Sequence, residues 1–160
     1  MKFGHEDLKV YGKLLEFFTD IQPLLTSCSR KHAFVDHLDR AGESMLFNVA
    51  EADRLTPGPK RLQIMDYAIG STLECAACLD IALVKSLTDS HIRQEKKADL
   101  YEICAMLVGL RNSWSTNAVS EPSVPYGQEE GRQFYFEQTD RYRVAMQFLQ
   151  WYVSTASGKH

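Results

Sequence analysis

The chain has 160 residues, of which 44% are apolar, and a formal net charge of −3 at pH 7. This length lets one domain, or one domain with an appendage, bury a core without disulfides or metals. A protein that binds nucleic acid through bulk charge is normally basic, so the composition disfavours that class and leaves room only for a local basic patch.

The composition also bears on location. No apolar run approaches the ~18 residues that a membrane span needs, and the N-terminal sequence MKFGHEDLKVYGK lacks the apolar stretch of a signal peptide. We therefore expect a cytoplasmic protein. Its cysteines lie in apolar helical sequence and do not resemble a secreted disulfide framework; they are Cys28, Cys75, Cys78 and Cys104.

The first two predicted elements are helices. Apolar residues recur every three or four positions from Glu6 to about Leu25, and Pro23 should kink or end this helix because it removes a backbone donor. A second helix should run from about Lys31 to Asp53 and stop before the breaker sequence TPGP at positions 56–59.

Two further helices complete the pattern. The third, from Lys60 to about Leu87, is apolar or small on two opposite sides, and such a helix is normally covered on both. Asp89 and its neighbours can cap a fourth helix, from about His91 to Trp114. Short connections between four long amphipathic helices predict an all-α fold, an antiparallel up-and-down four-helix bundle over residues 1–114.

An additional C-terminal helical segment is expected. Residues 115–131 are rich in proline and glycine and should form a linker or long loop. Residues 132–160 should form an amphipathic helix, packed on the bundle or on a partner. Tyr and Trp are frequent interface anchors, so the aromatic side chains of this segment are candidates for docking a protein: Tyr135, Tyr142, Phe148, Trp151 and Tyr152.

The second and third helices each carry a polar stripe. At 100° per residue, the four polar positions of the second helix fall within an arc of roughly 80°. These groups can form charge-assisted hydrogen bonds that fix helix register or specify how subunits meet. A carboxylate metal or acid–base site is the alternative, although a di-metal bundle would need Glu-x-x-His pairs, which the chain lacks. The stripe comprises Arg40, Ser44, Asn48, Glu51, Ser71 and Glu74.

Metal and cofactor sites are not predicted. The Cys75-x-x-Cys78 pair lies in the middle of a helix and lacks the second pair that a four-thiolate zinc site needs, so small apolar packing is the better interpretation. The histidines are scattered along the chain, and no glycine-rich phosphate loop is present.

Cations gather at one end of the predicted bundle. Because connections alternate between the two ends, the first and third should lie at the same end, which brings together Arg30, Lys31, Arg93, Lys96 and Lys97. Ordinary solvated helix ends are the alternative interpretation. In a ring of subunits, however, these cations would be repeated around one rim and attract phosphates or an acidic partner.

A spaced set of residues supports a resemblance over roughly residues 6–114. It consists of Leu38, Arg40-Ala41, Ser44, Asn48-Val49-Ala50-Glu51, Ala68, Gly70-Ser71 and Glu74. In these positions the chain resembles the 23S rRNA intervening-sequence proteins, which are similar in turn to the accessory variability determinant of diversity-generating retroelements. The resemblance implies a four-helix bundle, often a ring-shaped homopentamer, with no established enzymatic activity. In the retroelement branch it implies binding to a reverse transcriptase and to nucleic acid.

The predicted function is therefore a non-enzymatic, oligomeric scaffold that binds nucleic acid, a protein partner or both, beside a reverse transcriptase or another RNA-handling enzyme. The alternative is a purely structural oligomer that docks a protein through the aromatic C-terminal segment. An enzyme using Glu51 and Glu74 is a third interpretation.

Overall fold

The structure is a computed structural model that describes residues 1–28 and 32–118. Its elements are a 3-10 helix, η1 (Gly4–Asp7), and four long helices: α1 (Lys9–Ser27), α2 (Ala33–Arg54), α3 (Pro59–Val84) and α4 (Ser90–Ala118). The described residues contain no strand and belong to one compact unit, Met1–Ser120. The predicted all-α fold is confirmed, whereas the predicted helix over residues 132–160 lies outside the described residues.

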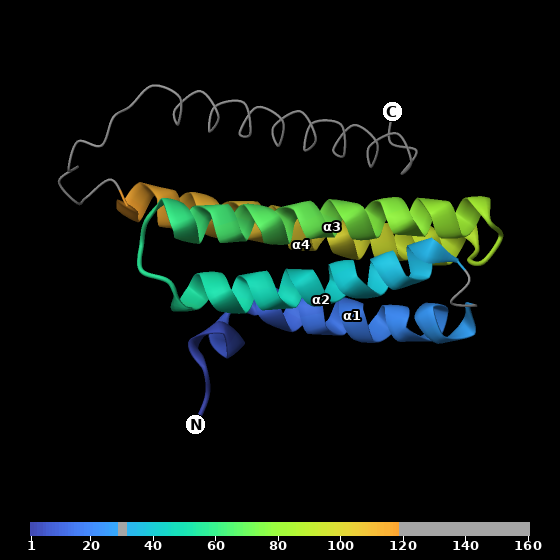
Figure 1. The fold of residues 1–160 in the computed structure, drawn as a ribbon, viewed down its shortest axis with the longest axis horizontal. Helices are drawn as coiled ribbons and strands as arrows, with labels where there is room; N and C mark the ends of the chain where they lie inside the picture. The colour runs from blue at the N-terminus through green and yellow to red at the C-terminus, as the bar shows by residue number, and fades with distance from the viewer. Residues whose placement is uncertain (29–31, 119–160) are drawn as a thin grey trace, which may run out of the picture. The chain divides into compact units, whose positions relative to one another are not determined.

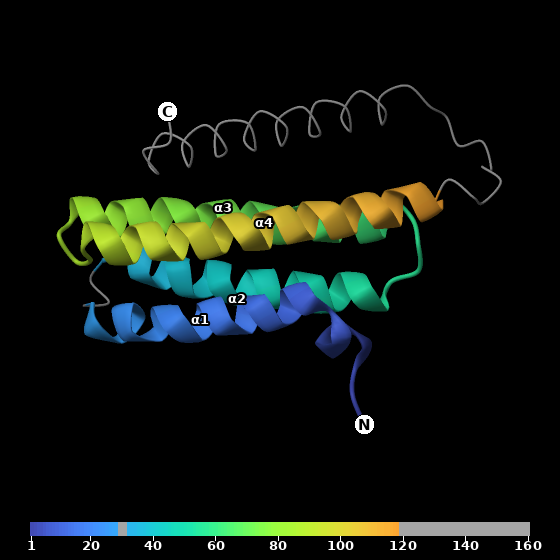
Figure 2. The ribbon, with the colours of Figure 1, turned by 180° about the vertical axis from the view of Figure 1, so that it is seen from behind.

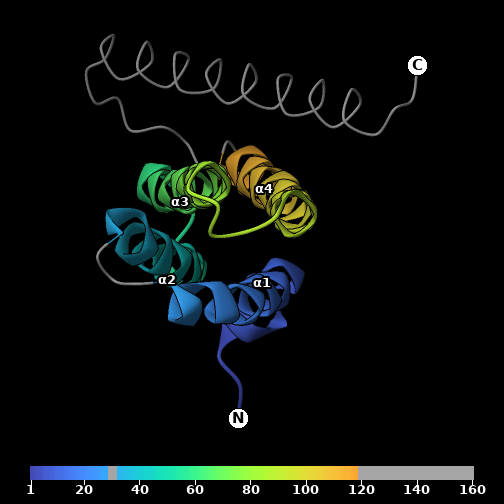
Figure 3. The same cartoon turned by 90° about the vertical axis from the view of Figure 1, so that its right-hand side faces the viewer.

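The four long helices form a bundle in which neighbours along the chain lie side by side. Figure 1 and Figure 2 show them running up and down, with the α2–α3 turn at one end and the α3–α4 turn at the other. Seen end-on in Figure 3, they occupy the corners of a quadrilateral, so that α1 also lies beside α4. The first and last helices therefore share a seam.

Every helix contributes to one apolar core. Side chains at three- and four-residue spacing face inward, and each one removed from water stabilises the fold by roughly 1.5–3 kcal/mol. The largest fully buried apolar side chains are Leu14, Phe17 and Ile21 of α1, Leu38, Met45 and Val49 of α2, Met65, Ile69 and Leu79 of α3, and Ile103 and Leu107 of α4.

The predicted helix boundaries hold at some ends and not at others. Pro23 lies inside α1, which continues to Ser27. This exposed proline removes only one backbone donor, and the Thr26 hydroxyl donates to the carbonyl oxygens of Gln22 and Pro23. Asp89 acts as the predicted cap, because its side chain accepts a hydrogen bond of 2.8 Å from the Ile92 backbone N–H.

The turn between α2 and α3 depends on glycine and proline. Gly58 has a φ of 154°, which a side chain would disfavour, and Pro59 follows at the first helical position, where its fixed φ suits a helix. This turn keeps the two helices antiparallel and adjacent. At the other end of the bundle α3 stops at Val84, before the predicted Leu87, and α4 runs on to Ala118, past the predicted Trp114.

Contrary to the expectation from apolar runs, α3 is long and apolar enough to cross a membrane, with a mean hydropathy of 1.5 over its best 18-residue window. In the structure part of this helix, including Met65, Ile69 and Leu79, is buried in the bundle. The core helix of a bundle meets the same criteria, so this composition carries little weight for location.

Gly42 allows α1 and α2 to approach closely. A methyl group at this position would stand 2.5 Å from Cδ2 and 2.6 Å from Cε2 of the Phe18 ring. The absence of a side chain is therefore a packing requirement of this helix pair.

Candidate functional site

The outer side of the α2–α3 pair carries a small hydrogen-bond network. The hydroxyl of Ser71 donates to that of Ser44 over 2.9 Å, and the Asn48 side-chain amide donates to the Ser44 hydroxyl and carbonyl oxygens over 3.0 and 2.8 Å. Three of the predicted stripe residues therefore form one connected group, which links the two helices and fixes their register.

The charged members of the predicted stripe behave differently. Glu74 pairs with His37 of α2 over 3.3 Å, and Arg40 pairs with Asp36 over 3.1 Å one turn away on its own helix. Glu51 is exposed and forms no ion pair with another described residue. Within the described residues Arg40 forms no ion pair with a glutamate of the stripe. The Glu74 side chain, which reaches across to α2, contacts the His37 imidazole instead.

An open pocket lies where these groups meet. It has a volume of about 300 Å³ and is lined by His37, Arg40, Ala41, Ser44 and Glu74. His37 was missed at the sequence level, although it precedes Ser44 by seven residues and therefore occupies the same side of α2. The pocket offers both charge signs and a hydroxyl, which suits a polar side chain of a partner.

Exposed apolar side chains lie on the same two helices as this network. Phe47 of α2 is 69% exposed, and Tyr67 and Ile81 of α3 are 53% and 41% exposed. Tyr67 and Ile81 belong to the second side predicted for α3. Phe47 was missed, although its sequence signal is a large apolar residue outside the core stripe of α2. We use the name α2–α3 face for the side of these two helices that carries Ser44, Phe47, Tyr67, Ser71 and Ile81.

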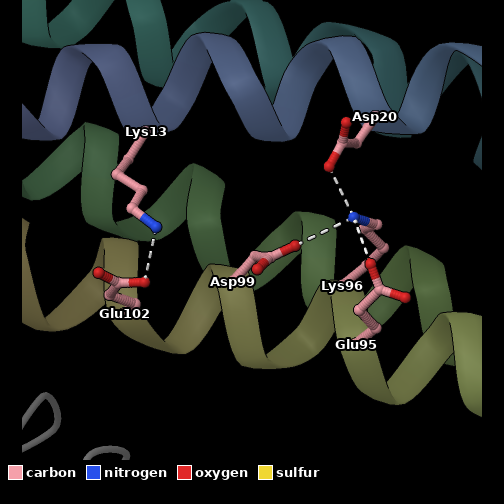
Figure 4. Close-up of polar contacts among 6 residues, drawn as sticks. All are labelled: Lys13, Asp20, Glu95, Lys96, Asp99 and Glu102. Atoms are coloured by element: carbon pink, nitrogen blue, oxygen red, sulfur yellow. Dashed lines mark hydrogen bonds and ion pairs between the residues drawn. The ribbon is translucent and has the colours of Figure 1, made fainter.

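The predicted pole of cations is organised around Lys96. Its side chain is only 11% exposed, and its ammonium group lies 2.7 Å from Asp20 of α1, 3.0 Å from Glu95 and 3.2 Å from Asp99 (Figure 4). Burial lowers the pKa of this lysine, but the hydrogen bonds to the three carboxylates outweigh burial and raise it above its ordinary value. Lys96 is therefore an internal, fully charged tie between helices.

Asp80 of α3 binds the other two described cations of the pole. It accepts hydrogen bonds from Arg93 over 2.8 Å and from Lys97 over 2.7 Å. Burial raises the pKa of Asp80, but these two donors outweigh burial and lower it below its ordinary value. All three described cations are therefore engaged in intramolecular pairs, and the role of this end in contacting nucleic acid or a partner stays a prediction.

A second pair completes the seam between α1 and α4. Lys13 donates a hydrogen bond of 3.0 Å to Glu102, and Figure 4 shows Asp99 between this pair and Lys96. Along this seam α1 thus supplies the cation Lys13 and the acid Asp20. The matching residues of α4 are the acid Glu102 and the cation Lys96. A shift of α1 by two turns would place Asp20 opposite Glu102, so the pattern favours the observed register.

Arginines tie the opposite end of the bundle together. The guanidinium of Arg61 lies 3.5 Å from the centre of the Trp114 ring, and its Nε donates to the Ala52 carbonyl oxygen over 2.9 Å. Arg111 binds Asp66 through two hydrogen bonds of 2.6 and 3.1 Å. These contacts between distant segments had no local signal in the sequence.

All four cysteines are buried and form no disulfide. Burial raises the pKa of Cys75 and Cys78 above their ordinary value and that of Cys104 to about 11, so these thiols stay protonated at neutral pH. Within residues 1–28 and 32–118 no group of three or more His, Cys, Asp or Glu side chains is placed to hold a metal ion.

Several predicted site residues lie outside the described part of the chain. These are the cations Arg30 and Lys31 and the C-terminal aromatic residues Tyr135, Tyr142, Phe148, Trp151 and Tyr152.

Comparison with known proteins adds one finding to the geometry. Residues 6–109 match the family described as 23S rRNA-intervening sequence protein. A search of curated proteins found no match. The family match covers more than half of the chain and all but the end of the four-helix bundle. The protein therefore belongs to the 23S rRNA-intervening sequence protein family.

Proposed function

We propose that the protein is a non-enzymatic homopentameric scaffold whose assembled surface binds nucleic acid. The subunit number and the partner class come from the resemblance described above, which also suggests a reverse transcriptase or another RNA-handling enzyme as the protein beside which the scaffold acts. The family membership is consistent with an RNA-related role.

The α2–α3 face is the observation that carries the assembly. Water-soluble monomers rarely expose large apolar side chains in a cluster, and Phe47, Tyr67 and Ile81 are all more than 40% exposed on neighbouring helices. The Ser44–Ser71 hydrogen bond on this face supplies polar groups that a second subunit can align with. A subunit that covers this face would gain apolar burial and a defined orientation.

Binding rather than catalysis is the activity that the described chemistry favours. The thiols of Cys75, Cys78 and Cys104 are buried and protonated, which suits packing and not nucleophilic attack. The His37–Glu74 pair is half exposed and lies at the rim of an open pocket, a position suited to contacting a partner. Metal analysis of the purified full-length chain tests the proposal, since a stoichiometric bound metal would contradict it.

The assembly is tested by substituting one exposed aromatic residue. Phe47→Glu places a charge in the α2–α3 face, and Leu15→Glu is the matched control because Leu15 is 45% exposed on α1. We expect light scattering to show an oligomer for the wild type and for Leu15→Glu, and a smaller species for Phe47→Glu with unchanged helicity. A wild type that is monomeric, or an oligomer that tolerates Phe47→Glu, would overturn the proposed scaffold.

A further inference from the structure

We infer that the scaffold contacts the phosphate backbone of RNA through the α2–α3 turn end of the bundle, at Arg54, Lys60 and Lys9. This inference rests on the proposed function and names its contact surface. The three residues belong to the C-terminal end of α2, the second position of α3 and the start of α1. In an up-and-down bundle these ends coincide, and Figure 1 shows them at the same side of the molecule.

The first argument is that these cations are free. All three are exposed, and none lies within 4.0 Å of a carboxylate in the described residues. By contrast, Arg93, Lys96 and Lys97 at the other end are 11–19% exposed in their side chains and are bound to acids. A phosphate can displace water from a free cation, whereas it must compete with a carboxylate for a paired one.

The second argument is that several acids at the turn end are paired with other cations. The carboxylate of Asp53 lies 3.9 Å from the guanidinium of Arg61, and the carboxylate of Asp66 accepts hydrogen bonds from two nitrogens of Arg111. Asp7 lies 3.5 Å from Lys2. The free cations are therefore not cancelled by these three acids. Glu6, Glu16 and Glu51 are exposed and form no ion pair within the described residues, and Glu51, one turn before Arg54 on α2, is the carboxylate that opposes the turn directly.

The third argument is the polarity of the whole bundle. Within about three turns of the α3–α4 end, carboxylates outnumber the described cations Arg40, Lys85, Arg93, Lys96 and Lys97; they are Asp20, Asp36, Asp39, Glu43, Glu74, Asp80, Asp89, Glu95 and Asp99. A polyanion is repelled by this end and attracted to the other, so an approaching RNA is oriented before it makes contact.

The turn itself suits contact with a backbone. Arg54 and Lys60 flank the uncharged segment 55–59, and six residues of chain separate them by at most about 22 Å. Gly58, in the middle, has no atom within 4 Å of the position that a Cβ would occupy, so the turn is open. In an oligomer this pair of cations would be repeated once per subunit, which multiplies weak phosphate contacts.

The test compares charge reversals at the two ends of the full-length protein. The probe is a fluorescein-labelled, mixed-sequence single-stranded RNA, and its binding is followed by anisotropy between about 50 and 200 mM salt. Arg54→Glu/Lys60→Glu should weaken binding by about tenfold or more and lower the slope of log K against log salt by about 1.4. Lys85→Glu is the matched control, since Lys85 is also exposed and has no ion pair in the described part of the chain but lies at the acidic end; the affinity of this variant for RNA should change little.

A second variant changes the same surface in the opposite direction. Glu51→Gln removes the opposing carboxylate and should strengthen RNA binding, an effect that misfolding cannot imitate. Wild-type binding that is insensitive to both turn-end variants, or equally sensitive to Lys85→Glu, overturns this surface and leaves the scaffold intact. A wild type that oligomerises but binds no RNA overturns this inference together with the nucleic-acid part of the proposed function.

Discussion

Lys96 of α4 and Asp20 of α1 lie 76 residues apart in the sequence and 2.7 Å apart in the structure. Their contact joins the first helix to the last, which have no short connection to hold them together. Because Lys96 is 9% exposed and Asp20 is half exposed, the pair sits at the edge of the core, where a charge is costly unless it is bound. The α1–α4 seam therefore depends on polar contacts as well as on apolar packing.

Replacing Lys96 by Met should lower the free energy of unfolding by about 1–2 kcal/mol, because three carboxylates lose their shared cation while remaining partly hydrated. Urea denaturation followed by circular dichroism measures the change. The control is Lys2→Met, whose ion pair with Asp7 is 3.5 Å long and highly exposed; its unfolding midpoint should match the wild type. Equal midpoints for Lys96→Met and the wild type would show that the cluster contributes nothing to stability.

The Asp80 carboxylate should give the protein an acid-sensitive component of stability. Its pKa is lower in the folded chain than the ordinary value of about 3.9 expected on unfolding. Its contribution is thus fully present above that ordinary pKa and is lost as the pH falls through the lower, folded-state pKa. Asp80→Asn should flatten the fall in stability at acid pH, as measured by urea midpoints at a series of pH values.

Removal of one donor tests the cause of this shift. In Lys97→Met the carboxylate keeps its burial but loses a hydrogen bond of 2.7 Å, so its folded-state pKa should be higher than in the wild type. The acid-induced loss of stability should therefore be smaller and should end at a higher pH. An acid limb that is unchanged in both variants would mean that other groups control it.

Gly42→Ala should destabilise the protein by about 1–3 kcal/mol, because the added methyl group would force the Phe18 ring to move or the helices to separate. Gly12→Ala in α1 is the matched control, since no atom lies within 4 Å of its Cβ position. That variant should be stabilised by up to about 1 kcal/mol, because alanine favours a helix over glycine. Thermal unfolding of the two variants side by side measures both effects, and opposite signs are the expected result.

The helices could be predicted because their signals are local. The spacing of Leu38, Met45 and Val49, for example, identifies the buried side of α2 without reference to any other element. The prolines were harder to interpret, because the pattern around Pro23 could not show that an exposed position tolerates the loss of one backbone donor.

The site was only partly predictable because ion pairing is not local. The sequence indicated that Arg93, Lys96 and Lys97 share an end of the bundle, but not that Asp20 and Asp80 would bind them. The contact between Arg61 and Trp114 could not be predicted either, because these residues are also far apart in the sequence. The polar stripe was resolved better, since Ser44 and Asn48 are one turn apart and Ser71 lies on the adjacent helix.

The unequal distribution of charge between the two ends gives the described four-helix bundle an electric dipole along its helices. At low ionic strength, two copies that meet end to end attract when unlike ends face each other and repel when like ends do. Added salt screens this preference within a Debye length of about 10 Å at 0.1 M. Solutions with a high protein concentration and low ionic strength should therefore favour head-to-tail alignment of the subunits. Added salt should remove this preference.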